Sequence, residues 1–127
     1  MNSKELGAYG EKIAAEYLGK KGYRIIDKNF LVKLSSLRKG EIDIVSKKNG
    51  VICFVEVKTL TGENLIISPQ EKVNFQKQRQ LVKISQLWLI KNKIPLDSKW
   101  QIDIVAIILD PETKKAEIQH FENAVSG

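Results

Sequence analysis

The first pattern of apolar and polar positions along the chain has the period of an α-helix. From Ser3 to about Lys20, apolar and small residues recur every three or four positions, which is the spacing of one face of an amphipathic helix. Gly22 follows as a residue suited to ending it. The predicted apolar stripe consists of Leu6, Gly10, Ile13 and Tyr17, with Gly7, Glu11, Ala14 and Leu18 beside it.

The next segments are typical of β-strands. Tyr23–Asn29 is predicted to form a first strand, followed by a basic loop over Leu34–Gly40. The clearest local signal is Asn49-Gly50, the preferred pair for a tight hairpin turn, which separates the strand-like runs 41–48 and 51–59. The sequence therefore predicts an antiparallel hairpin centred on this turn.

A second helix is predicted to start at Ser68. Ser68 is a favourable N-cap, Pro69 suits the first helical position, and Glu71 completes a capping box. We expect this helix to continue to about Asn92, before Pro95.

Two further strands complete the predicted elements. Gln101–Leu109 is apolar on both faces, as expected of a buried strand. Ala116–Phe121 follows a turn at Asp110-Pro111. The order of helix, three strands, helix and two strands predicts an α/β fold with a mixed central sheet flanked by helices. Because no repeat or linker interrupts the 127 residues, we expect one domain over 1–127.

Composition narrows the class of protein. Hydrophobic residues make up 43% and charged residues 28%, which is typical of a globular chain and not of a disordered one. The longest apolar runs, such as Val51–Val55 and Ile104–Leu109, are far shorter than the ~20 residues that cross a bilayer. The N-terminal segment is polar, and the single cysteine, Cys53, has no partner for an internal disulfide. We expect a protein of the reducing cytoplasm, without a membrane partner.

The charge is positive and uneven. The formal net charge is +6, and residues 1–58 carry 12 basic against 7 acidic side chains. Such an excess suits a polyanionic partner, of which nucleic acid is the first candidate. A basic protein with a merely solvated face has the same composition, so charge alone leaves both interpretations open.

Acidic residues meet in the predicted hairpin. With Asn49-Gly50 as a two-residue loop, Asp43 lies opposite Glu56, and Glu41 lies opposite Lys58. Directly opposed carboxylates destabilise a sheet unless something compensates their charge, and a hard cation such as Mg²⁺ prefers carboxylate oxygens. The alternative is a cross-strand salt bridge between Glu41 and Lys58 with Asp43 solvated, which leaves the pair Asp43–Glu56 unexplained.

These residues carry a resemblance to known nucleases. Asp43, thirteen residues ahead of Glu56-Val57-Lys58, resembles the Asp…Glu-x-Lys signature, PD-(D/E)xK, of the restriction-endonuclease-like superfamily. Over nearly the whole chain, the sequence is similar to the YraN family of small bacterial proteins, which is related to archaeal Holliday-junction resolvases. Gln101 departs from that family, which usually has Arg there. The matching pieces are Gly7-x-x-Gly10-Glu11, Gly22-Tyr23, Asn29-Phe30, Gly40-Glu41-Ile42-Asp43, Phe54-Val55-Glu56-Val57-Lys58, Lys77 and Asp103-Ile104-Val105.

The resemblance implies a restriction-endonuclease-like αβββαβ core and Mg²⁺-dependent hydrolysis of phosphodiester bonds, with Mn²⁺ as a substitute. Carried over, Asp43 and Glu56 become metal ligands and Lys58 the catalytic lysine. Glu11 matches a helical glutamate that helps to bind metal or to orient water. Glu41 is expected either in an outer shell or as the salt-bridge partner of Lys58. The expected substrate is structure-selective DNA, such as a junction, a flap or a single strand, and cutting a two-fold junction would favour a homodimer.

The second predicted helix adds basic residues to the candidate site. Lys77 lies on the apolar stripe of Val73, Leu81, Ile84 and Trp88, where a lysine is costly unless its ammonium reaches an anion. That anion is expected to be the carboxylate cluster or a substrate phosphate, and Gln80 shares the same aspect of the helix. The residues expected to bind nucleic acid are Arg38, Lys39, Lys72, Lys77, Arg79 and Lys83.

Other interpretations of the sequence remain beside the nuclease. The chain could be a nucleic-acid-binding accessory protein with a vestigial site, or an assembly protein whose basic face meets an acidic protein. His120 lies in the last predicted strand, far in sequence from any candidate cluster, and is expected to be structural. Cys53, Trp88 and Trp100 are expected to pack in the core.

Overall fold

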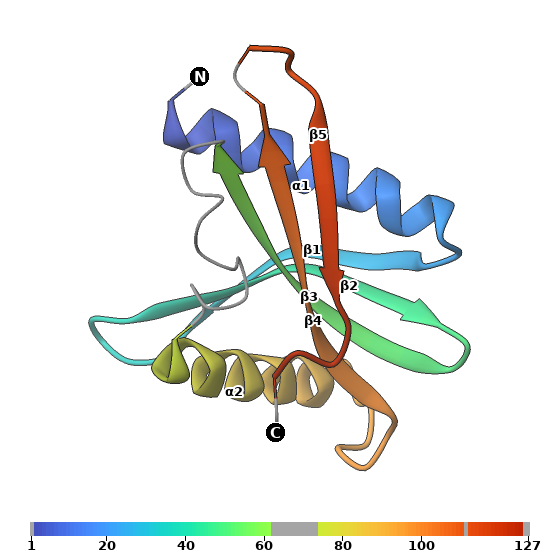
Figure 1. The fold of residues 1–127 in the computed structure, drawn as a ribbon. Helices are drawn as coiled ribbons and strands as arrows, with labels where there is room; N and C mark the ends of the chain where they lie inside the picture. Colours follow the sequence, from blue (N-terminus) through green and yellow to red (C-terminus); the bar gives the residue numbers. More distant parts are fainter. Residues whose placement is uncertain (1, 62–73, 111, 126–127) are drawn as a thin grey trace.

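In a computed structural model that describes residues 2–61, 74–110 and 112–125, a mixed five-stranded sheet lies between two helices (Figure 1). This confirms the predicted α/β class, and the arrangement is consistent with a restriction-endonuclease-like core. No helix among these residues is long and apolar enough to cross a membrane. The elements are α1 (Ser3–Lys20), β1 (Arg24–Lys33), β2 (Lys39–Lys48), β3 (Val51–Thr61), α2 (Phe75–Lys91), β4 (Trp100–Leu109) and β5 (Ala116–Phe121).

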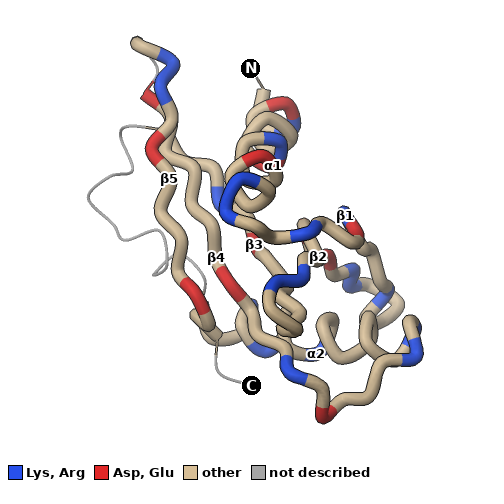
Figure 2. The backbone as a smooth tube through the Cα atoms, turned by 90° about the vertical axis from the view of Figure 1, so that its right-hand side faces the viewer, with Lys and Arg blue, Asp and Glu red and all other residues tan. Residues whose placement is uncertain are grey.

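The strands follow one another across the sheet in the order β1-β2-β3-β4-β5. Only β3 and β4 are parallel, and the other neighbours are antiparallel. A parallel pair needs a crossover connection, and α2 lies in that crossover. Figure 2 shows α1 and α2 on opposite sides of the strands, so each helix covers its own face of the sheet.

The helix α1 has the boundaries expected from its pattern. Asn2 caps its start, because the Asn2 side chain accepts the Glu5 N–H at 2.8 Å. Its buried residues are Gly10, Ala14 and Leu18. A Cβ atom at Gly10 would collide with the Thr59 side chain on β3. The glycine therefore lets this turn of the helix lie directly against the sheet.

The helix α2 begins later than predicted. It starts at Phe75, and Asn74 is its N-cap, with extended backbone and a side chain that accepts the Lys77 N–H at 2.9 Å. The prediction of one continuous helix from Ser68 is therefore wrong, because the chain is not helical at Asn74. The predicted capping box at residues 68–71 lies outside the described residues. The helix ends at Lys91, as expected.

The register of the central hairpin is confirmed, but its predicted length is not. The β2–β3 pairs run from Lys48–Val51 to Ile44–Val55, which is the register that a two-residue Asn49-Gly50 loop dictates. Both loop residues have positive φ, as this tight turn requires. The ladder ends at Ile44–Val55. The predicted ladder pairs Asp43–Glu56 and Glu41–Lys58 are therefore not formed.

Beyond this point the two strands diverge. Pairing of β2 with β1 continues to Lys33–Lys39, while pairing of β3 with β4 continues to Thr61–Leu109. The strand β1 is longer than predicted, so the basic loop shortens to residues 34–38. The sheet thus has an internal fork between β2 and β3, near the start of β2.

The core has two layers, one on each face of the sheet. Phe54 lies in the α2 layer, with its ring edge-to-face to Trp88 and Trp100 at centroid distances of 5.5 and 5.7 Å. Cys53 lies in the α1 layer and is 3% exposed. These contacts confirm the expected core packing of both tryptophans and the cysteine.

Candidate active site

The fork between β2 and β3 is held open by a side chain. The Asp43 carboxylate accepts the backbone N–H of Val57 at 2.8 Å. If the β2–β3 pairing continued, this N–H would instead donate to a backbone carbonyl of β2. Asp43 itself is only 9% exposed. A buried carboxylate at the base of the fork is the first element of the candidate site.

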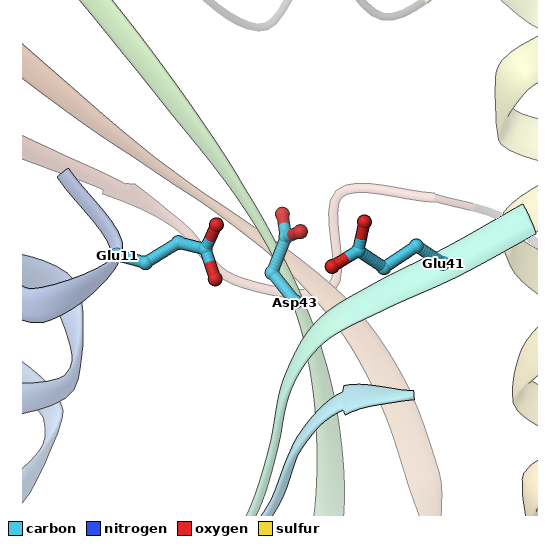
Figure 3. A group of neighbouring side chains, drawn as sticks. All are labelled: Glu11, Glu41 and Asp43. Carbon is cyan, nitrogen blue, oxygen red and sulfur yellow. The ribbon is translucent and has the colours of Figure 1, made fainter. Parts of the chain in front are cut away.

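Two glutamates join Asp43 from different elements. Glu11 comes from α1 and Glu41 from β2, and Figure 3 shows their carboxylates pointing toward that of Asp43. One oxygen from each residue lies within 4.8 Å of the others. We call Glu11, Glu41 and Asp43 the acidic cluster. The acidic cluster brings Glu11 beside Asp43, and it places Glu41, which was expected in an outer shell or paired with Lys58, equally near to both.

Asn29 connects two members of the acidic cluster, a role that the sequence analysis did not predict. Its side-chain Nδ2 donates to Glu11 Oε1 at 2.7 Å and to Glu41 Oε1 at 2.9 Å. Its backbone φ is 50°, in the left-handed region that asparagine tolerates better than most residues. In the sequence, the signal that could have pointed to Asn29 was its place in Asn29-Phe30, one of the pieces that match the YraN family. The amide holds the two glutamates side by side despite their like charges.

Glu56 lies next to the acidic cluster but outside the group that shares the 4.8 Å spacing. It is 7% exposed, and its Oε2 lies 3.4 Å from the Lys77 ammonium nitrogen. Oε2 makes no hydrogen bond, and in the described part of the chain it is the only buried side-chain nitrogen or oxygen in that condition. Lys77 thus finds its anion in a carboxylate, which was one of the two predicted partners.

Burial is the main cause of the raised pKa of Asp43. It raises the pKa of the Asp43 carboxyl from 3.8 to about 9, and a hydrogen bond and the charge of Glu56 act in the same direction. The charge of Glu11 raises the pKa further, while the Val57 N–H lowers it. The charged form of Asp43 is therefore unfavourable in the metal-free protein. A bound cation would favour that charged form, because carboxylate ligands bind metal when deprotonated.

The donor set fits a hard divalent cation. All the converging groups are carboxylates, which Mg²⁺ and Mn²⁺ prefer. The raised pKa of Asp43 reflects its burial and the carboxylate charge crowded around it, and the buried Glu56 Oε2 has the Lys77 ammonium beside it but no hydrogen bond from the described residues. The residues present are thus suitable ligands for the cation that the sequence predicts.

Lys58 does not form the salt bridge that was the alternative interpretation. Glu41 is hydrogen-bonded to Asn29, and no ion pair between Glu41 and Lys58 occurs in the described ranges. Lys58 is half-buried on β3, two residues after Glu56. Side chains two apart on a strand share a face, so Lys58 stays on the side of the sheet that carries Glu56.

A basic groove lies between the 34–38 turn and α2. Its volume is about 820 Å³. Among the described residues, its lining includes three cationic side chains and no acidic one. These lining residues are Leu34, Ser35, Arg38, Gln76, Arg79, Gln80, Val82, Lys83 and Gln86. We refer to it as the α2 groove. Among the residues predicted to bind nucleic acid, Arg38, Arg79 and Lys83 meet here.

The remaining predicted residues are distributed differently. Gln80 lines the α2 groove and does not belong to the acidic cluster. Lys39 is exposed at the start of β2. Lys72 lies outside the described residues.

His120 has a partner at each ring nitrogen, on the α1 side of the sheet. Its Nε2 lies 2.8 Å from Asp103 Oδ2, and its Nδ1 lies 3.0 Å from the Tyr17 hydroxyl. Gln101, at the position that departs from the family, donates to Asp103 Oδ1 at 2.9 Å. These contacts tie β5 and α1 to β4, which agrees with the structural role expected for His120.

The fold and the site together describe a small α/β protein with a carboxylate cluster in a forked mixed sheet. Residues 10–107 match the Uncharacterised protein family UPF0102, and the chain belongs to this family, which is the YraN family that its sequence resembles. A UPF0102 protein of Caldanaerobacter subterraneus is 42% identical over 98% of this chain and 97% of its own length. UPF0102 proteins of Alkaliphilus oremlandii and Clostridium botulinum are 41% and 38% identical, each over 96% of this chain and over 98% and 94% of their own lengths.

Proposed function

We propose that this protein is a nuclease that uses Mg²⁺ or Mn²⁺ to hydrolyse phosphodiester bonds of nucleic acid, with DNA as the main substrate. The observation that carries the proposal is the acidic cluster in the fork, where three carboxylates converge and burial and neighbouring carboxylates raise the pKa of Asp43. The Asp…Glu-x-Lys spacing and the α/β fold support it, because both resemble those of restriction-endonuclease-like nucleases.

The proposed ligands of the cation are Asp43, Glu56 and Glu11, and the position of Glu41 in the acidic cluster supports its participation. A bound divalent cation supplies charge neutralisation at the phosphate and activation of the attacking water. The protein contributes the placement of the carboxylates. Asn29 holds Glu11 and Glu41 together, and the Val57 N–H fixes the direction of Asp43.

The two lysines near the site have separate proposed roles. Lys58 is proposed to stabilise the charge that develops on the phosphate, since a fixed cation at that position favours the transition state. Lys77 is proposed to hold Glu56 in place through their contact at 3.4 Å. Arg38, Arg79 and Lys83 in the α2 groove are proposed to bind the phosphates of the substrate.

The main alternative is a nucleic-acid-binding accessory protein with a vestigial nuclease site, because the same groove would serve that function. A cleavage panel of labelled junction, flap, duplex and single-stranded DNA, with Mg²⁺, Mn²⁺ or a chelator, separates the two. We expect metal-dependent cutting that Asp43→Ala abolishes. The matched control is Asp97→Ala, which removes an exposed carboxylate from the loop after α2. Binding without cutting by the wild type under every metal condition would favour the accessory protein.

The second alternative is an assembly protein whose basic face meets an acidic protein. Binding of DNA measured at two salt concentrations tests it, because phosphate contacts weaken steeply with salt. No binding to DNA or RNA at low salt would leave the assembly function as the better explanation of the charge.

A further inference from the structure

Two large apolar side chains are exposed at the edges of the α2 groove. Leu37 is 94% exposed and directly precedes the lining residue Arg38. Phe75 is 71% exposed, and its ring centroid lies 5.7 Å from the guanidinium carbon of the lining residue Arg79. Each of the two segments that form the groove, the 34–38 turn and α2, therefore carries a large exposed apolar side chain next to a cationic lining residue.

A groove that only held duplex phosphates would not need these apolar residues. The phosphates lie on the outside of a duplex and its bases are stacked inside, so Phe75 and Leu37 would contact charged and sugar groups. Unpaired bases instead expose flat apolar faces, which stack on aromatic rings beside a positively charged groove. Arginine against the same ring adds to such stacking.

The polar lining of the groove agrees with exposed bases. Beside its three cationic residues, the groove has three glutamines, Gln76, Gln80 and Gln86, and a serine, Ser35. Amide groups donate and accept hydrogen bonds at the same time, as base edges do, whereas phosphates only accept. In single strands these base edges are accessible to side chains.

Both walls of the α2 groove continue along the chain into residues of the candidate site. On one wall, Arg38 precedes Glu41 by three residues in the chain. On the other wall, Lys77 belongs to the same helical turn as Gln76 and pairs with Glu56.

We infer that the α2 groove binds an unpaired strand of nucleic acid, with Phe75 as a stacking platform for a base and Leu37 as an apolar wedge at the opposite edge. This inference rests on the proposed function, and it makes the substrate a nucleic acid with unpaired bases, such as a single strand or the arm of a branch. A continuous duplex would use only the cationic side chains.

Binding measured without cleavage tests the inference separately from the nuclease activity. Fluorescence anisotropy in a chelator would compare a labelled single strand with a blunt duplex of the same length. We expect tighter binding of the single strand, and a loss of at least about fivefold for that strand alone in Phe75→Ala. Phe75→Trp should restore the affinity. Leu96→Ala, which removes a 50% exposed leucine outside the groove, is the control and should change nothing.

A base analogue reports the stacking directly. A single strand that contains 2-aminopurine should lose fluorescence on binding to the wild type, and this quenching should be absent in Phe75→Ala. Arg79→Ala should weaken single strand and duplex alike and reduce the salt dependence of both. Equal losses on both substrates in Phe75→Ala, or unchanged quenching, would overturn the inference. Selective binding without any metal-dependent cutting would overturn only the nuclease, and cutting of blunt duplex as fast as single strand would overturn only the inference.

Discussion

The Lys77 ammonium lies 3.4 Å from the Glu56 carboxylate, which links the first turn of α2 to the middle of the sheet. The contact joins a side chain that is 34% exposed to one that is 8% exposed. No described residue donates a hydrogen bond to Glu56 Oε2 that could replace this contact. Removing the lysine would therefore leave a buried carboxylate without its cation.

Lys77→Met should show this dependence. At pH 8 we expect a loss of about 1 kcal/mol in the free energy of unfolding, since the lysine is partly screened by solvent, and a large loss of cleavage. Adding Glu56→Gln to Lys77→Met should restore the melting temperature but not the cleavage. Wild-type cleavage by Lys77→Met would show that the lysine merely extends along the edge of the apolar stripe.

The stability of the metal-free protein should fall as the pH rises. The folded state raises the pKa of Asp43 from 3.8 to about 9, so between these values the folded chain holds a proton that the unfolded chain has lost. The stabilisation is complete below the lower value and disappears toward the higher one. Asp43→Asn keeps an acceptor for the Val57 N–H and removes the charge. It should raise the melting temperature at pH 8 by roughly 4 °C or more and flatten the pH dependence, whereas Asp97→Asn should leave the slope unchanged.

Divalent cations should stabilise the protein through the acidic cluster. A ligand at about 100 times its dissociation constant adds about 2.7 kcal/mol to the free energy of unfolding. Mg²⁺ or Mn²⁺ should therefore raise the melting temperature, and more so at pH 8 than at pH 6, because the cation competes with the proton on Asp43. Glu11→Gln should reduce the shift, while Glu16→Gln, on an exposed position of α1, should not. A melting temperature indifferent to both metals would count against the site.

Asn29 should affect metal affinity more than stability. Asn29→Gly keeps the backbone conformation and loses both hydrogen bonds to the glutamates, so we expect Mn²⁺ binding, measured by calorimetry, to weaken by about tenfold or more. Asn29→Ala adds a backbone cost of about 1 kcal/mol. Asn49→Ala is the matched control, because Asn49 has a similar φ of 52° in the hairpin turn. It should lose stability without any change in metal affinity.

Lys58 should act on the rate and not on binding. Lys58→Met keeps the apolar stem and removes the charge, and we expect kcat to fall by about 10²-fold or more with the affinity for DNA nearly unchanged. Single-turnover cleavage together with anisotropy would separate the two quantities. If both fell by the same factor, Lys58 would be a phosphate-holding residue and its proposed role would be wrong.

The parts of the fold that follow from local signals were predictable from the sequence. The period of Leu6, Gly10 and Ile13 sets the extent of α1, and Asn49-Gly50 sets the register of the hairpin. The start of α2 was not predictable in this way, because the sequence offers two possible N-caps. Ser68 has the stronger local capping signal, but the N-cap of α2 in the structure is Asn74.

The candidate site was predictable in its members more than in its geometry. The turn and its register predict that β2 and β3 stay paired along their whole length. In the structure, the Asp43 side chain accepts the Val57 N–H in place of a backbone carbonyl, and the pairing ends there. This competition between side chain and backbone has no signature in the hydrophobic pattern. Asn29 lies outside any periodic set, and its role depends on the meeting of α1 with β2, which is a tertiary event.

Because Gly10 has no side chain, α1 can lie close to β3 beside the candidate site. The contact of Gly10 with Thr59 fixes how near α1 lies to β3, and Glu11 is the next residue along the helix. Any side chain at position 10 would lift this turn and carry the Glu11 carboxylate away from Asp43. If the acidic cluster binds a cation as proposed, its width is therefore governed by a residue that contributes no atom to it, and enlarging Gly10 to alanine would widen the cluster without removing a single carboxylate.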